Sequence, residues 1–471
     1  MVAWQSHRVD AEIALQRAID KARTAGASYV DVRLEQTSGL TLSLKDGAVE
    51  RAIPLGEGGI GARVLYKGAW GFASTSELTT KAIGRAFERA LRLARLSAGE
   101  GADPIILAEA PTATVDRKLK VRSAAEDVGI DVKHRLMLEV EAAAREEPLV
   151  CTVSQSYQDH QTQTLFLSSD GTRVRSMVPV LLHATSVVVR RGADLNSYRV
   201  RTGGTQGWEV FSQKDPRQRA REAAATAVLH LGAKAAPSGR LPVVLDPDLN
   251  GVFVHEALGH ACEADLVAAG DSCLAGRLGQ QVGASSVTIV DDPTLEGLFG
   301  SFPIDAEGLA GRRKVLLRQG VLQEYINNRE TAGKYHLTPN GGARVESYAF
   351  RPLVRMSNTY MQAGDHSFEE LLAPIKHGVY AKGTRGGQVD TALGSFQFSA
   401  QEAFLIEDGQ ITSPLSNLAL SGATLEILRS VEALGKDLTM SDPGFCGKGQ
   451  VVDVTDGGPH VRISSAIIGG G

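Results

Sequence analysis

Two histidines and a glutamate lie close together near the middle of the 471-residue sequence, as His255-Glu256-Ala-Leu-Gly259-His260. Imidazole rings bind zinc, and a neighbouring carboxylate can activate the attacking water of a zinc hydrolase. The common i, i+4 spacing places both rings on one face of a helix, whereas the spacing here is i, i+5. On a regular helix the two rings would point about 140° apart. A one-residue π-bulge would restore the shared face, and Gly259 would ease that distortion.

The same segment has an interpretation without a metal. Two histidines on a helix can lie with one ring facing solvent and the other hydrogen-bonded, and spacing alone does not separate the two cases. Glu263 could orient a histidine ring from outside the ligand set, and Cys262 is a further potential ligand. Packing or surface positions are the simpler explanation for both residues. Cys262 is only two residues from His260 and is expected to face elsewhere.

A cysteine far along the chain could complete a metal site. Cys446 lies between glycines in Asp442-Pro-Gly-Phe-Cys446-Gly-Lys448-Gly. A thiol on such a tight loop is accessible, and Lys448 would favour the thiolate. With His255 and His260, Cys446 would form a His2Cys zinc site whose fourth position stays open for water, as a catalytic zinc requires. A lone buried cysteine is the alternative, and the spacing does not decide between them.

The composition excludes several classes of protein. Lys and Arg number 50 against 54 Asp and Glu, so the formal net charge is −4. A protein that binds nucleic acid would carry a basic excess or stripe. No stretch of about 18 uncharged apolar residues occurs, so we expect no membrane-spanning helix. Neither nucleic acid nor a membrane is therefore an expected partner.

The cysteines and the N-terminus indicate a cytoplasmic protein. The first residues lack the basic head and apolar run of a signal peptide. The four cysteines are dispersed, without the C-x-x-C pairs of a zinc finger or redox site. In a chain of this length, such sparse cysteines are typical of a reducing compartment.

Apolar periodicity predicts helices and hairpins in the first half of the chain. Leu15 and Ile19 share one face of a helix that should end at Gly26, and a second amphipathic helix spans 83–94. Alternating strands meet at turns such as Asp46-Gly47. Asp215-Pro216 should cap a helix that runs to about His230.

The second half predicts mostly hairpins around one short helix. The segment 235–239 (Ala-Ala-Pro-Ser-Gly) is the expected boundary. We therefore predict an α+β protein: an N-terminal α+β domain (1–235) and a β-rich C-terminal domain (240–471) that carries the short metal-binding helix. A capping box at Ser367-Phe-Glu-Glu370 should open a further helix that ends at Gly378.

One glycine motif needs a structural rather than a nucleotide-binding explanation. Residues 56–61 fit G-x-G-x-x-G letter for letter. A dinucleotide site requires a strand before this motif and a helix after it. Here a strand pattern and a Lys67-Gly68 turn follow, so we predict a glycine-containing strand and no cofactor other than the metal.

Several short motifs in residues 240–471 share their order and spacing with a known family. They are His255–His260 with Glu263 and Asp265, Pro303–Gly308, Arg355–Tyr360, Gly386–Asp390, Cys446–Lys448 and Gly469–Gly471. Together they resemble the TldD/PmbA family of cytoplasmic metalloproteases, once called modulators of DNA gyrase. The first half is similar more loosely. The sequence departs from the family at Asn340-Gly-Gly-Ala-Arg344, where Gly-Asn-Gly-Arg is usual.

The resemblance implies roles for the residues of the site. The family divides into a TldD type with H-E-x-x-x-H, which binds a zinc ion, and a PmbA or TldE type without it, and this sequence resembles the TldD type. His255, His260 and Cys446 would then be the zinc ligands and Glu256 the general base. The i, i+5 spacing is the family's own, and Glu263 remains a candidate for a residue that supports the ligands.

The resemblance also implies an activity and an assembly. It implies a zinc-dependent metalloprotease that cuts unfolded or short peptides with low sequence specificity inside a dimeric chamber. The dimer would be a homodimer or a heterodimer with a PmbA/TldE-type subunit. Glu256 would take a proton from water and pass it to the leaving amine. Arg344 and Tyr348 are candidate donors to the tetrahedral intermediate.

A glycine-rich hairpin could hold an extended peptide as an added strand. The segment Gly386-Gly387-Gln388 is a plausible edge for this, although a plain tight turn explains it as well. Such binding through the backbone would exclude folded proteins.

Two other functions remain as alternatives. A non-catalytic peptide-binding or regulatory subunit of a protease complex would be expected to lose the glutamate and histidines, which this sequence retains. A cysteine hydrolase that uses Cys446 with a distant histidine would leave the H-E-x-x-x-H helix unexplained.

Overall fold

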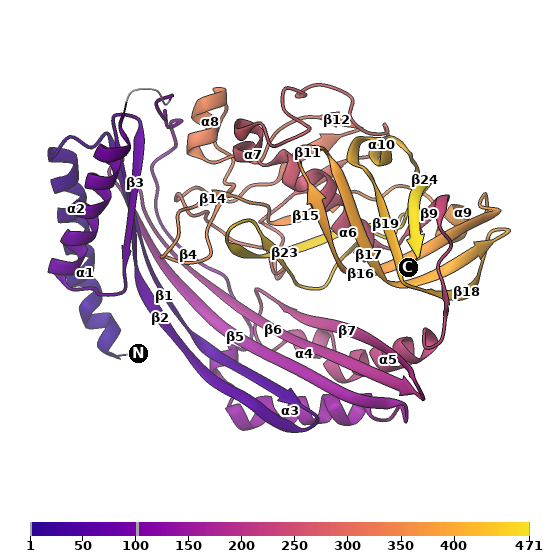
Figure 1. Cartoon of the computed structure of the whole chain (residues 1–471). Coiled ribbons are helices and arrows are strands. Elements are labelled where there is room, and N and C mark those ends of the chain that lie inside the picture. The colour runs from indigo at the N-terminus through magenta and orange to yellow at the C-terminus, as the bar shows by residue number, and fades with distance from the viewer. Residues whose placement is uncertain (1, 100–102, 471) are drawn as a thin grey trace.

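The computed structural model of the protein describes residues 2–99 and 103–470, so Gly471 of the last motif lies outside the described residues. One long, curved and mostly antiparallel sheet dominates the first half, and the second half lies against its concave side (Figure 1). The strands of this first sheet are β1 (Tyr29–Lys45), β2 (Ala48–Tyr66), β3 (Ala69–Thr75), β4 (Thr114–Lys118), β5 (Val150–Ser168), β6 (Arg173–Arg191) and β7 (Asp194–Gly204).

The order of the first sheet is β3-β2-β1-β5-β6-β4, and β7 pairs with the remaining part of β6. The helices of this half are α1 (Val2–Thr24), α2 (Thr80–Ser97), η1 (Ala125–Asp127), α3 (Ile130–Ala144), α4 (Val210–Gln213) and α5 (Pro216–Leu229). The predicted caps are present: Gly26 follows α1 with φ 97°, and the Asp215 side chain accepts a hydrogen bond at the start of α5.

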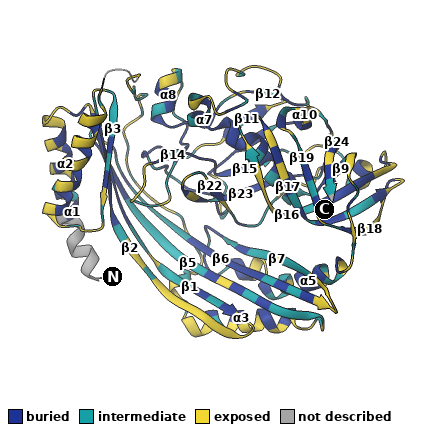
Figure 2. Cartoon of the chain, in the orientation of Figure 1, coloured by how far each residue is buried: buried dark blue, intermediate teal, exposed yellow. Residues whose placement is uncertain are grey.

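Two separate hydrophobic cores support the two ends of this sheet. Ile83 and Phe87 of α2 pack with α1 against Val30 and Val32 of β1 at one end. Helices α3 and α5 cover β5 and β6 at the other end, around Tyr157. Figure 1 shows the two helix pairs at opposite ends of the long strands. Between them the first half of β2 is exposed (Figure 2).

The predicted turns and the glycine motif behave as expected in the first half. Asp46 and Gly47 both adopt positive φ, at 49° and 77°, and join β1 to β2. This left-handed pair matches the twist of a two-residue hairpin, which explains why Asp-Gly is used here. Residues 56–61 lie within β2, so the prediction of a strand is confirmed.

The second half contains three sheets and short helices. Its strands are β8 (Lys234–Ala235), β9 (Gly239–Leu245), β10 (Ile289–Asp291), β11 (Lys314–Arg318), β12 (Val321–Leu322), β13 (Ala343–Arg344), β14 (Leu353–Val354), β15 (Asn358–Met361), β16 (His377–Asp390), β17 (Ser395–Glu407), β18 (Gln410–Ser416), β19 (Leu418–Ala423), β20 (Val431–Leu434), β21 (Thr439–Met440), β22 (Gly444–Gly447), β23 (Val451–Gly458) and β24 (Val461–Gly470). Its helices are α6 (Pro247–Phe253), η2 (Val254–Gly259), η3 (His260–Cys262), α7 (Ala264–Ala269), α8 (Arg329–Tyr335), α9 (Phe368–Leu372) and α10 (Thr424–Arg429).

The largest sheet of this half closes on itself. Its order is β16-β9-β24-β19-β17-β18-β8, and β16 also pairs with β17, so five strands form a ring. Strand β9 leads directly into α6, whose Phe253 packs against Phe396 of β17. The ring therefore supports the start of the segment that carries the two histidines.

The predicted α+β class is confirmed, and one predicted helix is too long. The capping box at Ser367 and Glu370 is present, but α9 ends at Leu372 rather than Gly378. Gly378 instead lies in β16, where a Cβ would approach the Pro242 carbonyl oxygen to 2.7 Å. Among the helices of the described ranges, none combines the length and apolar character that crossing a bilayer requires.

Buried ion pairs join the two halves. Arg63 of β2 binds Asp31 of β1 at 2.5 Å and Glu307 of the second half at 3.0 Å, and all three side chains are buried. Glu307 also accepts the backbone N–H of Arg329. Removal of one partner from such a network leaves an uncompensated buried charge. The network therefore holds the first sheet in a defined position against the second half.

Candidate metal centre

The segment that carries the two histidines begins as an ordinary helix and then widens. Asp246 caps α6 by accepting the Leu249 N–H at 2.8 Å, and Pro247 occupies its first turn. The next turn, η2, is a π-helix in which the N–H of His260 bonds to the carbonyl of His255. The widened turn that the five-residue spacing would need for a shared face is thus present. It brings the two rings onto one side of the helix, with their centroids 5.1 Å apart.

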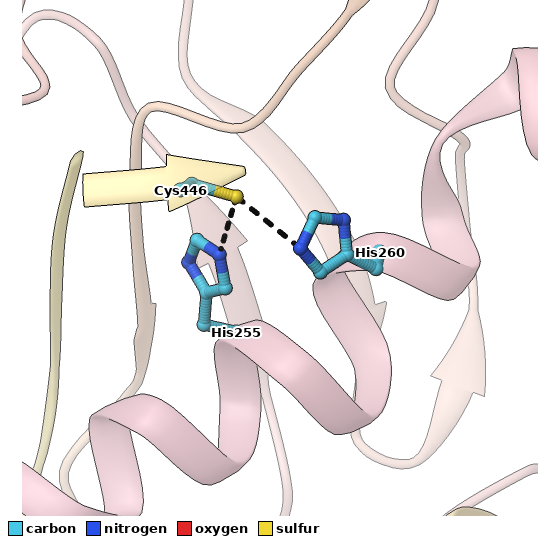
Figure 3. A group of neighbouring side chains, drawn as sticks. All are labelled: His255, His260 and Cys446. Carbon is cyan, nitrogen blue, oxygen red and sulfur yellow. Dashed lines mark hydrogen bonds between the residues drawn. The ribbon is translucent and has the colours of Figure 1, made fainter. Parts of the chain in front are cut away.

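Cys446 reaches the same point from strand β22 (Figure 3). Its Sγ lies 3.1 Å from His255 Nε2 and 3.2 Å from His260 Nε2. Two atoms bound to one zinc ion are at most about 4.6 Å apart, since zinc–ligand bonds are about 2.0–2.3 Å long. All three residues are buried. The two imidazoles and the thiol are therefore close enough to hold one ion, and this donor set suits zinc.

A carboxylate orients each histidine from the opposite side of its ring. His255 Nδ1 donates to Asp456 at 2.7 Å, and His260 Nδ1 donates to Glu263 at 2.9 Å. Both Nε2 atoms are thereby directed at Cys446. Such carboxylate–histidine pairs fix the tautomer and ring orientation of metal ligands. The structure places Glu263 in the position that the sequence suggested.

Lys448 does not act on the thiol in the way that the sequence suggested. Its ammonium instead pairs with Glu263 at 3.1 Å and Asp265 at 2.9 Å. Arg355, which is fully buried, donates to the carbonyl of Cys446 at 2.6 Å and lies 3.8 Å from Glu263. These two cations hold the Glu263 carboxylate and the cysteine loop together. Cys262 faces the hydrophobic core, as expected.

The pKa values of the three candidate metal ligands are shifted in opposite directions: that of the thiol is lowered and those of the imidazoles are raised. Burial alone would raise the pKa of the Cys446 thiol, but the charge and hydrogen bonds of His255 and His260 lower it to about 5. Burial would lower the pKa of His260, yet Glu263 and Cys446 raise it to about 10. Asp456 and Cys446 raise the pKa of His255 well above its usual value in the same way. A metal must displace the imidazole protons, so its affinity falls as pH falls.

Glu256 lies beside this cluster and lines a cavity of about 480 Å³. Its carboxylate is 3.8 Å from His260 Nε2 and is partly accessible. Burial raises the pKa of Glu256. The cavity lies between β7 of the first half and η2, β16 and β22 of the second half, and His255, Gly386, Gly387 and Phe445 also line it.

The two candidate donors for the tetrahedral intermediate lie elsewhere. Arg344 donates to the carbonyls of Met356 and Asp453, both at 2.7 Å. Tyr348 packs close to Gly59 of β2, at the contact between the halves. Among the residues described along the cavity, neither is present. The structure therefore gives no support to these two assignments.

A glycine is required at position 259 because the side chain of Met356 leaves no room for a Cβ, not because of the backbone conformation. Its φ and ψ are helical, at −56° and −52°, but a Cβ would lie 2.0 Å from Met356 Sδ. We expect Gly259→Ala to cost about 1–3 kcal/mol through overpacking and to weaken zinc binding by moving His260. Gly84→Ala is the matched control, because a Cβ at Gly84 in α2 meets nothing within 4 Å.

Thermal unfolding and zinc titration of both variants test this expectation. The helical Gly84→Ala change should leave the midpoint unchanged or raise it, since alanine is the better helix former by about 1 kcal/mol. Equal midpoints and equal zinc affinity for the two variants would contradict the role assigned to Gly259.

Comparisons with known proteins place the chain in a family. The PmbA/TldA metallopeptidase models match it in three parts: domain 1 at residues 30–94, the central domain at 124–231 and the C-terminal domain at 238–470. A metalloprotease of Methanothermobacter thermautotrophicus is 41% identical over 445 residues, which cover 94% of this chain and 95% of the relative. The chain belongs to the PmbA/TldD metallopeptidase family. The resemblance drawn from the sequence is thus confirmed.

Other PmbA/TldD proteins agree in sequence and in fold. A protein of Saccharolobus solfataricus named zinc metalloprotease TldD homologue is 30% identical over 455 residues, covering 96% of this chain and 99% of the relative. The crystal structure of TldE from Thermococcus kodakarensis has a TM-score of 0.77 at 17% identity, covering 97% of this chain and all of that one. The second likeness concerns the fold alone.

Proposed function

We propose that this PmbA/TldD chain is a zinc-dependent peptidase that hydrolyses unfolded or short peptides with low sequence specificity. The observation that carries the proposal is the convergence of the buried His255, His260 and Cys446 beside Glu256, which together with His255 lines a cavity. The name of the Saccharolobus relative supports the choice of zinc. A non-catalytic peptide-binding subunit would have no use for a carboxylate at this position.

Each residue of the site would have a separate role in hydrolysis. His255, His260 and Cys446 would hold the zinc ion, which when bound would polarise the scissile carbonyl and the attacking water. Glu256 would accept a proton from that water and return it to the leaving amine. The raised pKa of Glu256 suits a group that must both take and give a proton near neutral pH. Glu263 and Asp456 would keep the imidazoles in place.

An edge of β16 is suited to hold the peptide. Strand β16 pairs with β17 along one side, but on the other side it pairs with β9 only at Val379–Ala381. Beyond that point no described strand covers this side, and Gly386 and Gly387 line the cavity with Glu256. An extended peptide could therefore add to β16 through backbone hydrogen bonds. Gln388 is not among the described lining residues.

The facing strand β7 offers no comparable edge, because side chains already bind it. These bonds run from Arg385 to the Ser197 carbonyl (3.4 Å), from Gln401 to the Arg199 carbonyl (2.9 Å) and from the Arg201 N–H to Asp442 (3.0 Å). The strand edge open to a peptide is thus that of β16, which favours recognition through the backbone and the exclusion of folded proteins.

We also propose that the working particle is a dimer in the cytoplasm. The fold shared with TldE supports either a homodimer or a heterodimer with a TldE-type subunit. Mass measurement of the purified chain, alone and after purification from its native source, distinguishes these assemblies.

Zinc removal tests the proposed function. Zinc-loaded protein should cleave an unstructured, quenched fluorescent peptide, and chelator treatment should abolish cleavage until one equivalent of zinc is restored. A folded protein of similar length is the control substrate and should remain intact. Bound zinc without cleavage of any peptide would favour the regulatory subunit instead, and cleavage that survives complete loss of zinc would overturn the proposal.

A further inference from the structure

Three arginines line the cavity that contains Glu256. Arg199 and Arg201 are alternate residues of β7, so both side chains point from the same face of the strand. Arg385 joins them from β16, across the contact between the two halves. Like charges at neighbouring positions of a sheet repel each other. Arg199 and Arg385 are exposed to solvent and Arg201 is half-buried, so the group is accessible to an anion that enters the cavity.

These arginines form no direct ion pair in the part of the chain that the structure describes. Within the described ranges, none of the three guanidinium groups has a carboxylate oxygen within the 4.0 Å of an ion pair. Arg201 donates to the carbonyl of Pro443 at 3.1 Å, and Arg385 donates to the Asn196 side chain at 3.2 Å. Both acceptors are neutral. The guanidinium of Arg199 has no hydrogen-bond acceptor in the described part of the chain.

Two acidic residues of the same cavity are held by other side chains. Asp442 is held by Arg219 through two bonds of 2.8 and 2.6 Å, and Asp456 binds His255. Burial raises the pKa of Asp248 to about 6, so its carboxyl is still mostly ionised at neutral pH. Burial and the charge of Arg199 lower the pKa of Arg201, while Asp442 and Asp248 act in the opposite direction. The three arginines therefore face nearby negative charge, but none of them forms a direct ion pair with a carboxylate that the structure describes.

A second cavity adjoins the one that Arg199, Arg201 and Arg385 line. Its volume is about 900 Å³, and it shares Ser197, Arg385 and Gln401 with the cavity of Glu256. Arg385 thus lies where the two spaces meet. A peptide that extends from β16 toward the second cavity would pass this guanidinium.

We propose that Arg199, Arg201 and Arg385 form a carboxylate-binding site that positions peptides for cleavage beside Glu256. The inference rests on the proposed peptidase function and names its preferred substrates: peptides with a carboxylate close to the scissile bond. Guanidinium groups bind carboxylates through paired, charge-assisted hydrogen bonds. The carboxylate belongs either to the C-terminus of a short peptide or to an Asp or Glu side chain.

Binding to a full-length, zinc-loaded Glu256→Gln protein tests the site without turnover. Four labelled peptides distinguish a C-terminal carboxylate from a side-chain carboxylate. The first two share one sequence and end in a free acid or an amide. The other two are amides that carry either Glu or Gln at one chosen internal position. The same peptides are then given to protein with Glu256 intact, to compare kcat/KM. Arg199→Gln, Arg385→Gln and the double variant remove the charge, and Arg51→Gln, an exposed strand residue of β2, is the matched control.

We expect the acid form to bind at least about tenfold more tightly than its amide, because a hydrogen bond to a charged group contributes about 1.5–3 kcal/mol. The double variant should bring this ratio close to one, with the loss in KM rather than kcat. Arg51→Gln should keep the ratio. A preference for the Glu peptide over the Gln peptide would assign the site to acidic side chains, and a preference only for the free acid would assign it to C-termini.

Two outcomes separate this inference from the proposed function. If zinc-dependent cleavage occurs with equal binding of all four peptides, or if the arginine variants keep the preference, the carboxylate site is wrong and the peptidase stands. If no peptide is cleaved but the arginine-dependent binding preference is present, the peptidase is wrong and the site stands. Arg199→Lys and Arg385→Lys, which keep the charge, should retain part of the preference and guard against effects of misfolding.

Discussion

Glu256→Gln is expected to lower kcat/KM for an unstructured peptide by about 10²–10⁴-fold, the range in which general acid–base groups act. Glutamine has nearly the same shape but cannot take a proton from water. Glu256 lies outside the group of three donors, and its carboxylate is 3.8 Å from His260 Nε2. Zinc content should therefore stay at one equivalent while activity falls. Peptide cleavage and elemental analysis of the same samples measure both quantities.

A surface glutamate provides the control for this change. Glu432 of β20 is exposed and pairs with Arg462 of the neighbouring β24, and it is not among the described residues that line the cavity, so Glu432→Gln should leave both cleavage and zinc content unchanged. Full activity in Glu256→Gln would remove Glu256 from the mechanism. Loss of zinc in that variant would instead mean that Glu256 helps to hold the metal.

Cys446→Ser is the change with the largest expected effect on zinc affinity. The Cys446 thiol, with its pKa lowered to about 5, is a thiolate at neutral pH and a strong zinc ligand, whereas a serine hydroxyl stays protonated. We expect the affinity to fall by more than the about 10–100-fold that loss of a carboxylate behind a ligand costs. Asp456→Asn, which perturbs only the partner of His255, should fall within that smaller range.

Competition with a chromophoric chelator measures these affinities. Cys151→Ser is the matched control, because Cys151 is half-buried in β5, far along the chain from the histidines, and its thiol donates a hydrogen bond to the Val188 carbonyl. Stoichiometric zinc in Cys446→Ala would show that the third ligand is another residue. An Asp456→Asn effect larger than that of Cys446→Ser would place Asp456, rather than Cys446, at the metal.

Local sequence patterns predicted the parts of the site that lie on one short segment. The five-residue spacing of His255 and His260 required a widened turn, and η2 is that turn. Glu263 follows His260 by three residues, so its contact with the ring is also a local matter. Cys446 is different, because nothing in its spacing connects it with the histidines. Its place in the group was predicted by resemblance to a family.

The residues of the site that the sequence did not predict are brought into place by tertiary packing. Asp456 comes from β23, whose neighbour β22 carries Cys446, and a single acidic residue in a strand has no local signature. Asp31 and Arg33 alternate with the apolar Val30 and Val32 along β1, yet both are buried, because the second half of the chain contacts them. The arginines of β7 likewise become a group only when the halves meet.

The division of the cavity between the two halves has a consequence for how related proteins can diverge. His255, His260, Cys446 and Glu256 all belong to the second half, while Arg199 and Arg201 belong to β7 of the first half and only Arg385 of the proposed carboxylate site comes from the second. Under the proposed function, substitutions on β7 would alter which peptides are accepted without changing any candidate metal ligand. Peptide selectivity and metal binding would then evolve through separate sets of residues in one chain.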